Sequence, residues 1–198
     1  MPRTADHAAR RAQIADGLVR VAARDGLHAV TMRAVAAEAG VSLRLVQYYF
    51  ETKAQLMRAS LEHLERRAAE RLDARLARLP DPVPARAFVE ALLAEALPAD
   101  AAGRAFHLVW TSYAVLSMTD PELAAQPFVE GPDRLERRLA DVLRRADGLR
   151  DGRDPGAEAA RLLALNHGLG TGVLVGQRTP AQAREILRHH LDELFPEA

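Results

Sequence analysis

Apolar residues recur every three or four positions along most of this 198-residue chain, which is the spacing of one face of an α-helix. No segment shows the alternation of apolar and polar residues that is typical of a half-buried β-strand. The pattern therefore predicts an all-α fold of nine or ten helices, with a three-helix head and a larger helical part after it. The longer predicted helices cover residues 8–24, 53–79, 85–97, 101–118, 135–146, 155–175 and 180–195, and two short ones lie between 31 and 50.

Residues that favour helix ends mark several of these boundaries. Capping boxes, in which two side chains bond each other's backbone amides, and Asp-Pro pairs that open a helix both occur. Pro127 and the Gly131-Pro132 pair are expected to interrupt the helical piece after residue 120, because proline removes a backbone donor. The predicted capping patterns are Thr52 with Gln55, Thr179 with Gln182, Asp120 before Pro121, and Asp154 before Pro155.

The stretch from Thr31 to Phe50 has the pattern of a helix-turn-helix. Thr31 can cap a first short helix and Ser42 a second one, and Gly40 permits the positive φ that a tight turn between them requires. In such a unit the second helix lies in the major groove of DNA. An ordinary helical hairpin within an all-α protein fits the spacing equally well.

Inner and outer positions separate clearly in this stretch. The apolar residues can form one buried seam, while the polar and charged ones fall nearer the outside, where a base edge or a phosphate could be met. The predicted seam is Val35, Ala36, Ala39, Val41, Val46 and Phe50, and the outer set is Arg33, Ser42, Leu43, Arg44, Gln47 and Tyr48.

Charge is distributed unevenly although the chain sums to zero. Residues 1–58 hold nine basic and five acidic side chains, a net charge of +4, so the remaining residues carry −4. A basic head on an acidic body places the attraction for phosphate near the N-terminus. The absence of cysteine excludes disulfides and thiolate metal sites and leaves the redox compartment open. No apolar run is long enough to span a bilayer, so a soluble, cytoplasmic protein is expected.

These residues resemble the DNA-binding signature of the TetR family of one-component bacterial repressors. The likeness rests on the Thr-x-Arg-x-(small/apolar)-Ala start at Thr31, the Ala-Gly-Val-Ser turn at 39–42, and the Tyr49-Phe50 pair followed by Lys53. It departs from the family at Arg44, where a small residue is usual, and at Gln47, where a phosphate-contacting Tyr is usual. The candidate DNA-binding residues are Thr31, Arg33, Ser42, Leu43, Arg44, Gln47, Tyr48, Tyr49 and Lys53.

The resemblance also implies that the chain has two functional domains. Residues 1–52 would be the DNA-binding domain and residues 53–198 the effector-binding and dimerisation domain. Trp110, the Asp-Pro-Glu-Leu run at 120–123 and His167-Gly168-Leu169 are similar to landmarks of the subgroup that includes the choline-responsive repressor of betaine synthesis.

One cluster mixes aromatic surface with hydrogen-bonding groups, as a small-molecule pocket does, although Phe106 and Trp110 could equally be core residues. The family places an effector cavity among the middle helices of its C-terminal domain, which favours a pocket. The candidate effector residues are Phe106, His107, Trp110, Tyr113, Ser117 and His167.

Three glycines, Gly168, Gly172 and Gly176, are spaced four apart in a predicted helix. Each costs roughly 1 kcal/mol relative to alanine, which the close approach of another helix could offset. In the TetR family the last two long helices pair with those of a second copy as a four-helix bundle. The candidate dimer residues are Leu162, Leu165, Leu169, Gly172, Gly176, Ile186, His190 and Leu194.

The sequence thus predicts a ligand-responsive transcriptional regulator that is not an enzyme. It would be a homodimeric repressor released from a palindromic DNA operator by an unidentified small molecule, without membrane contact. Neither a cofactor nor a metal is expected, because the histidines lack a convergent spacing and no phosphate loop or nucleophile motif occurs. The alternatives are an activator of the same fold, or an all-α small-molecule or lipid-binding protein or enzyme with a vestigial helix-turn-helix.

Overall fold

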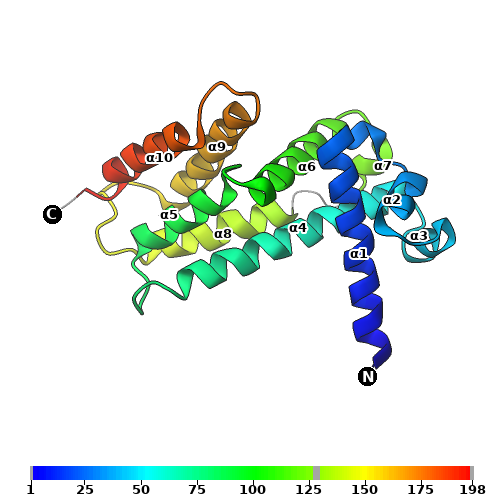
Figure 1. Cartoon of the computed structure of the whole chain (residues 1–198). Coiled ribbons are helices and arrows are strands. Elements are labelled where there is room, and N and C mark those ends of the chain that lie inside the picture. Colours follow the sequence, from blue (N-terminus) through cyan, green and yellow to red (C-terminus); the bar gives the residue numbers. More distant parts are fainter. Residues whose placement is uncertain (1, 127–129, 197–198) are drawn as a thin grey trace. The chain divides into compact units, whose positions relative to one another are not determined.

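The computed structural model describes residues 2–126 and 130–196, with the side chains of residues 2–5 left out. Within this part the chain forms ten α-helices and one short 3-10 helix, η1, and no strand, so the predicted all-α fold is confirmed (Figure 1). No helix of the described part combines the length and the apolar character that crossing a bilayer demands. The helices are α1 (Pro2–Asp25), η1 (Leu27–Ala29), α2 (Met32–Ala39), α3 (Leu43–Tyr49), α4 (Lys53–Leu76), α5 (Ala85–Ala96), α6 (Ala101–Ser117), α7 (Pro121–Ala124), α8 (Glu130–Arg144), α9 (Pro155–Leu174) and α10 (Pro180–Leu194).

The chain folds into two compact units. The first comprises Met1–Arg66 and Leu108–Phe128, and the second comprises Arg67–His107 and Val129–Ala198. Two helices, α4 and α6, contribute residues to both units. The boundaries between these compact units therefore fall inside helices.

The first unit contains the expected three-helix head. Helix α1 packs on α2, and α2 packs on α3, around a seam of fully buried apolar side chains. The two helices of a helix-turn-helix cannot bury this seam by themselves, and α1 covers its remaining side. The central residues of the seam are Ile14, Leu18, Val21, Val35, Val46 and Phe50.

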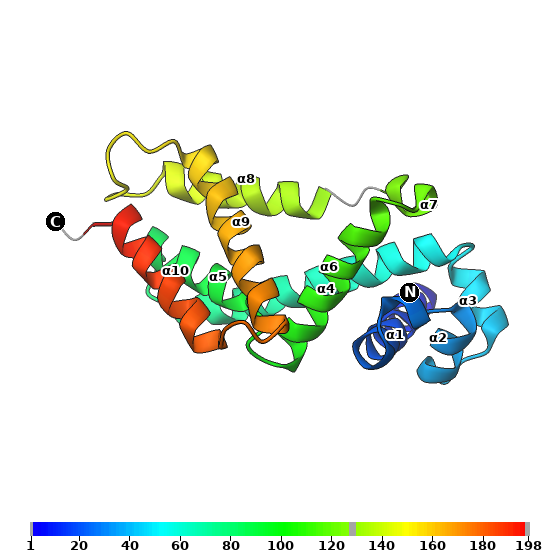
Figure 2. The same cartoon turned by 90° about the horizontal axis from the view of Figure 1, so that it is seen from above.

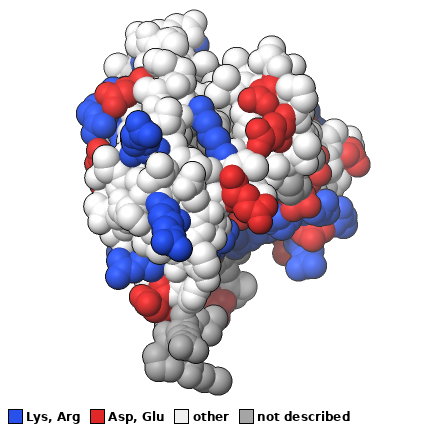
Figure 3. Space-filling view, turned by 90° about the vertical axis from the view of Figure 1, so that its right-hand side faces the viewer, with Lys and Arg blue, Asp and Glu red and all other residues white. Residues whose placement is uncertain are grey.

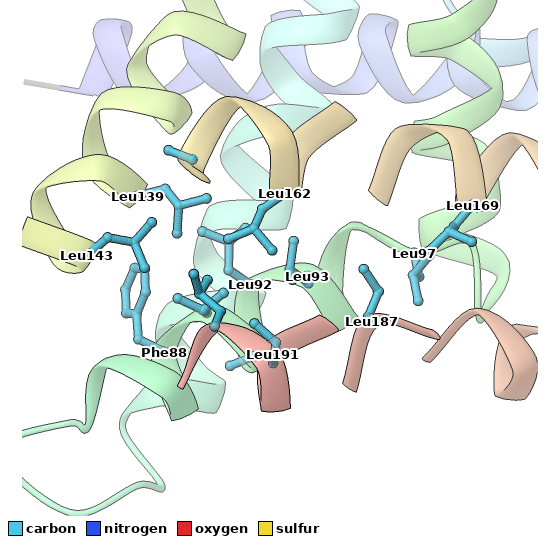
Figure 4. Close-up of a cluster of buried hydrophobic side chains, with 14 of the residues drawn as sticks. Phe88, Leu92, Leu93, Leu97, Leu139, Leu143, Leu162, Leu169, Leu187 and Leu191 are labelled. Carbon is cyan, nitrogen blue, oxygen red and sulfur yellow. The ribbon is translucent and has the colours of Figure 1, made fainter. Parts of the chain in front are cut away.

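The second unit has a core built mainly of leucine. Helix α5 contacts α8, α9 and α10, and α9 also packs against α8 and α10 (Figure 2). Figure 4 shows side chains of these four helices meeting in the interior. Each buried leucine contributes on the order of 2 kcal/mol of transfer free energy, which makes this cluster the main support of the unit. The labelled side chains are Phe88, Leu92, Leu93, Leu97, Leu139, Leu143, Leu162, Leu169, Leu187 and Leu191.

Two helix starts differ from the prediction. Helix α1 begins at Pro2 rather than near Ala8, and α8 begins at Glu130 and runs through Gly131 and Pro132. Proline is tolerated in the first turn of a helix because the amide it lacks would have no partner there. The interruption expected at Pro127 lies outside the described residues.

Most of the predicted caps are confirmed. The side chains of Asp120 and Asp154 accept hydrogen bonds from backbone amides of the first turns of α7 and α9. Thr179 and Gln182 form the complete capping box of α10. At α4 the pattern is different, because Gln55 Oε1 accepts from the amide of Glu51 and not from that of the cap residue.

Candidate nucleic-acid interface

The turn between α2 and α3 has the geometry that its sequence predicts. Thr31 Oγ1 accepts a hydrogen bond from the amide of Ala34, and Ser42 Oγ accepts one from the amide of Leu45, each at 3.1 Å. Gly40 adopts a left-handed conformation with φ of 66°. A residue with a Cβ would be strained there, so this glycine sets the angle at which α3 leaves α2.

Helix α3 presents a polar outer face. Val46 and Phe50 are buried beneath it, which fixes the rotation of the helix about its own axis. Arg44 and Gln47 are exposed, and Tyr48 is 70% exposed, an unusual state for an aromatic ring on a folded head. Of the other candidates, Thr31, Arg33, Ser42 and Lys53 are exposed, whereas Leu43 and Tyr49 are half-buried.

The basic residues of the head fall into two groups. Arg11, Arg20 and Arg24 form hydrogen bonds or ion pairs inside the head. In contrast, no hydrogen bond or ion pair to Arg33, Arg44 or Lys53 is found within residues 2–126 and 130–196. Figure 3, which views the side of the chain where α2 and α3 lie, shows Lys and Arg side chains set apart among uncharged surface. Arg33, Arg44 and Lys53 therefore keep their hydrogen-bond donors available for phosphate or base edges.

Glu38 joins α2 to α1 through two arginines. Its Oε1 accepts from Arg20 Nε and its Oε2 from Arg24 Nη1, both at 2.8 Å. Hydrogen bonds from Arg24 and then Arg20 lower the pKa of the Glu38 carboxyl, and the same contacts, with help from Asp25, raise the pKa of Arg24. Sequence reasoning missed this cluster, because its members come together only when the two helices pack.

The turn is also anchored from α1. Gln13 Nε2 donates to the carbonyl of Ala39 at 2.8 Å, next to Gly40. Gly17 lies one turn further along α1, and a Cβ added there would stand 2.8 Å from Cβ of Ala39. A glycine inside an amphipathic helix is the signal that could have revealed this close approach.

The N-terminal turns of α1 lie against the end of α3. The ring of His7 is 5.5 Å from that of Tyr49 and 6.3 Å from that of Tyr48, and the two tyrosine rings are 5.2 Å apart. One turn along, Arg11 donates to the carbonyl of Tyr49 and its guanidinium lies 4.6 Å from the centre of the Phe50 ring. Nothing in the spacing of the sequence indicated this contact.

Helix α4 is bonded to α1 by a buried histidine. His63 Nε2 lies 2.9 Å from Asp16 Oδ1, and Arg66 donates to the other ring nitrogen, Nδ1. The Nε2 atom therefore carries the hydrogen and donates to the carboxylate. At its N-terminus α4 exposes Lys53, beside the capping hydroxyl of Thr52.

The six candidate effector residues are divided between the two units. Trp110, Tyr113 and Ser117 belong to the first unit, where Tyr113 is fully buried and Ser117 bonds the carbonyl of Ala114 in its own helix. Burial is the main cause that raises the pKa of the Tyr113 hydroxyl. Phe106, His107 and His167 belong to the second unit.

The second unit brings His107 and His167 together. Their rings are stacked at 4.9 Å with 17° between the planes, and His107 Nε2 lies 3.3 Å from Thr171 Oγ1. Burial, and then the neighbouring His167, lower the pKa of His107 to about 4, and burial also lowers the pKa of His167. Gly170 makes the packing possible, because a Cβ there would clash with Cε1 of His107.

The candidate dimer residues do not all reach the surface, and the prediction is corrected here. Leu162, Leu169 and Leu194 are buried in the core of their own chain, and Gly172 is buried as well. Gly176 lies beyond the end of α9 with φ of 77°, so the three glycines do not share one helical face. Ile186 is exposed, and Leu165 and His190 are half-buried. The surface of α9 instead carries a row of small residues, Ala157, Ala160, Ala164 and Gly168.

Comparison with known proteins agrees with this geometry. Residues 9–60 match the tetR family of bacterial regulatory proteins, and residues 84–196 match the C-terminal family of BetI-type transcriptional repressors. The HTH-type transcriptional regulator PksA of Bacillus subtilis is 25% identical over 199 residues, which cover 100% of this chain and 95% of PksA.

Solved structures show the same fold. A transcriptional regulator from Rhodococcus sp. Rha1 is 30% identical, with a TM-score of 0.73 and 93% of each chain covered. A transcriptional regulator from Saccharomonospora viridis, solved in complex with choline, is 28% identical with a TM-score of 0.82, covering 96% of this chain and 98% of that one. The chain described here therefore belongs to the TetR family, and it is a ligand-responsive, DNA-binding transcriptional regulator with a BetI-type C-terminal part.

Proposed function

We propose that this regulator is a homodimeric repressor that binds a palindromic operator and leaves it when a small molecule binds. In this proposal residues 1–52 read DNA, and residues 53–198 bind the effector and the second copy. The protein would act in the cytoplasm, where bacterial DNA lies, and would not be an enzyme. The observation that carries the proposal is the exposed face of α3 with Arg44, together with the unengaged cations Arg33 on α2 and Lys53 on α4.

The residues divide by the part of DNA that they would contact. Lys53 at the N-terminus of α4 suits a phosphate, because its ammonium and the amide groups of the helix end attract the same anion. Thr31 and Arg33, exposed at the start of α2, also suit phosphates. Arg44, exposed on the outer face of α3, would bond a guanine with two donors, a contact worth about 1–3 kcal/mol of discrimination.

A comparison of Arg44→Ala with Lys53→Ala tests this division. The duplex would be the one that the wild-type protein enriches from a random pool, and anisotropy would be measured over a series of salt concentrations. Arg44→Ala should relax the preference at one base pair of each half-site. Lys53→Ala should weaken all sequences alike and flatten the logarithmic salt slope by about one per protomer. Equal, sequence-independent losses from both variants would refute base reading by Arg44.

A second copy would join through the exposed faces of α9 and α10. The row of small residues on α9 allows a partner helix to approach closely, and Ile186 adds apolar surface on α10. Two recognition helices must then lie roughly 34–36 Å apart to enter successive major grooves. Ala164→Arg should give a monomer in sedimentation velocity, and Glu70→Arg, an exposed change on α4, is the matched control. Unchanged dimerisation of Ala164→Arg would exclude this face.

Choline is the first effector to test. The related protein from Saccharomonospora viridis was solved with choline, and the match to BetI-type repressors covers residues 84–196. Trp110 on α6 offers an aromatic face, which attracts quaternary ammonium groups. Choline should release the selected duplex in the anisotropy assay with a coupling of about 1–3 kcal/mol. If neither choline nor glycine betaine changes DNA affinity, the effector belongs to another chemical class.

A further inference from the structure

The exposed ring of Tyr48 is held from one side by a residue of another helix. Its ring stands nearly perpendicular to that of Tyr49, at 83° and 5.2 Å, and that of His7 lies tilted at 6.3 Å. His7 also meets Tyr49 edge to face, at 69°. The three rings therefore form one cluster in which His7, from α1, supports two neighbouring residues of α3.

A second contact joins the same part of α1 to the end of α3. Arg11, which lies on the same side of α1 one turn later, donates to the carbonyl of Tyr49 at 3.3 Å and covers the Phe50 ring. A cation at this end of α3 also interacts favourably with the helix dipole. Two successive turns of α1 thus dock on the last turn of the recognition helix.

The cluster leaves Tyr48 directed at solvent. The Tyr48 side chain is 70% exposed, whereas the two aromatic residues that follow it, Tyr49 and Phe50, are half-buried and buried. An exposed ring ordinarily samples several rotamers and loses that freedom when it binds. Ring contacts that restrict it before binding reduce this loss, which improves affinity without any new contact to DNA.

We propose that His7 is a positioning residue for DNA recognition: it orients Tyr48 toward the duplex through ring packing. The surface that reads the operator then includes the first turns of α1, outside the helix-turn-helix. Asp6, the acidic residue beside His7, lies 3.9 Å from Arg10, so its charge is partly balanced at the point where phosphate would approach. Direct bonding of phosphate by the imidazole is the competing role, and the variants below separate the two.

The test uses the full chain and the duplex enriched by the wild-type protein. His7→Ala should weaken binding about threefold to tenfold, the range expected for one lost aromatic contact. His7→Phe keeps a ring but no donor, and should bind within about twofold of wild type. Added to Tyr48→Ala, the His7→Ala change should cause no further loss, because the residue it supports is gone. His28→Ala, at an exposed histidine of η1, is the matched control and should bind as wild type does.

Four results would overturn the proposal. Wild-type affinity of His7→Ala would show that the ring does not matter. Equal losses in His7→Phe and His7→Ala would assign a donor to phosphate instead of a positioning ring. Additive losses with Tyr48→Ala would show that His7 acts independently. A clear fall in the melting temperature of His7→Ala, absent from His28→Ala, would make the role one of head stability.

Discussion

The buried imidazole of His107 should make the stability of the protein depend on pH. The residue is 4% exposed, and burial with the neighbouring His167 lowers its pKa from the ordinary 6.5 to about 4. Between these two values the unfolded chain holds a proton on this residue and the folded chain does not. The free energy of unfolding should therefore fall as pH drops from about 6.5 to about 4. Above about 6.5 the ring is neutral in both states, so His107 no longer makes stability depend on pH.

The size of the effect follows from the two pKa values. Their difference corresponds to an upper limit of about 3 kcal/mol. Relaxation around a charged ring and screening by nearby water reduce it, so we expect about 1–2 kcal/mol. His107→Gln removes the titrating group but keeps a polar side chain of similar length. The change in unfolding free energy with pH should be smaller in this variant by the amount due to His107. The change due to His167, whose pKa is also lowered, should remain.

Urea unfolding followed by circular dichroism, at fixed protein concentration and from about pH 4 to about pH 7.5, measures this directly. The quantity to compare is the change in unfolding free energy across the range, in wild type and in His107→Gln. Fixed concentration matters because a dimer would make the apparent stability depend on it. An equal change in both proteins would refute the claim that His107 is neutral and desolvated in the folded state.

Three further variants test close packing in the head, a helix cap in the second unit and a buried hydrogen bond. Gly17→Ala should destabilise the head by about 1–3 kcal/mol in urea unfolding, because the new Cβ meets that of Ala39 at 2.8 Å; a more stable protein would contradict this close approach. Thr179→Ala should cost about 1 kcal/mol through the lost cap of α10, and unchanged stability would show that the cap is dispensable. Asp16→Ala should cost about 1–2 kcal/mol by leaving the His63 donor unpaired, and adding His63→Leu should recover part of the loss. Strictly additive losses in that double variant would argue against the bond.

Local features of this protein were determined by the sequence alone. Thr31, Ser42 and Thr179 cap their helices through bonds to residues three positions away, and Gly40 turns the chain through its own backbone. Interactions of this range depend on neighbours in the sequence, so a short stretch of residues suffices to predict them. The all-α class and the exposed face of the recognition helix follow in the same way, from the period of the apolar residues.

Only the tertiary structure decided which charges and rings remain available. The sequence predicts both Arg20 and Arg44 on outer faces of helices. In the structure Arg20 bonds Glu38 of another helix, whereas Arg44 lies exposed on the face of α3. Leu162 looked suited to an interface and is instead buried in its own core, while His7 meets Tyr48 from a distant part of the chain. These outcomes depend on which helix faces pack together, and the free energy of that packing is a property of the whole fold.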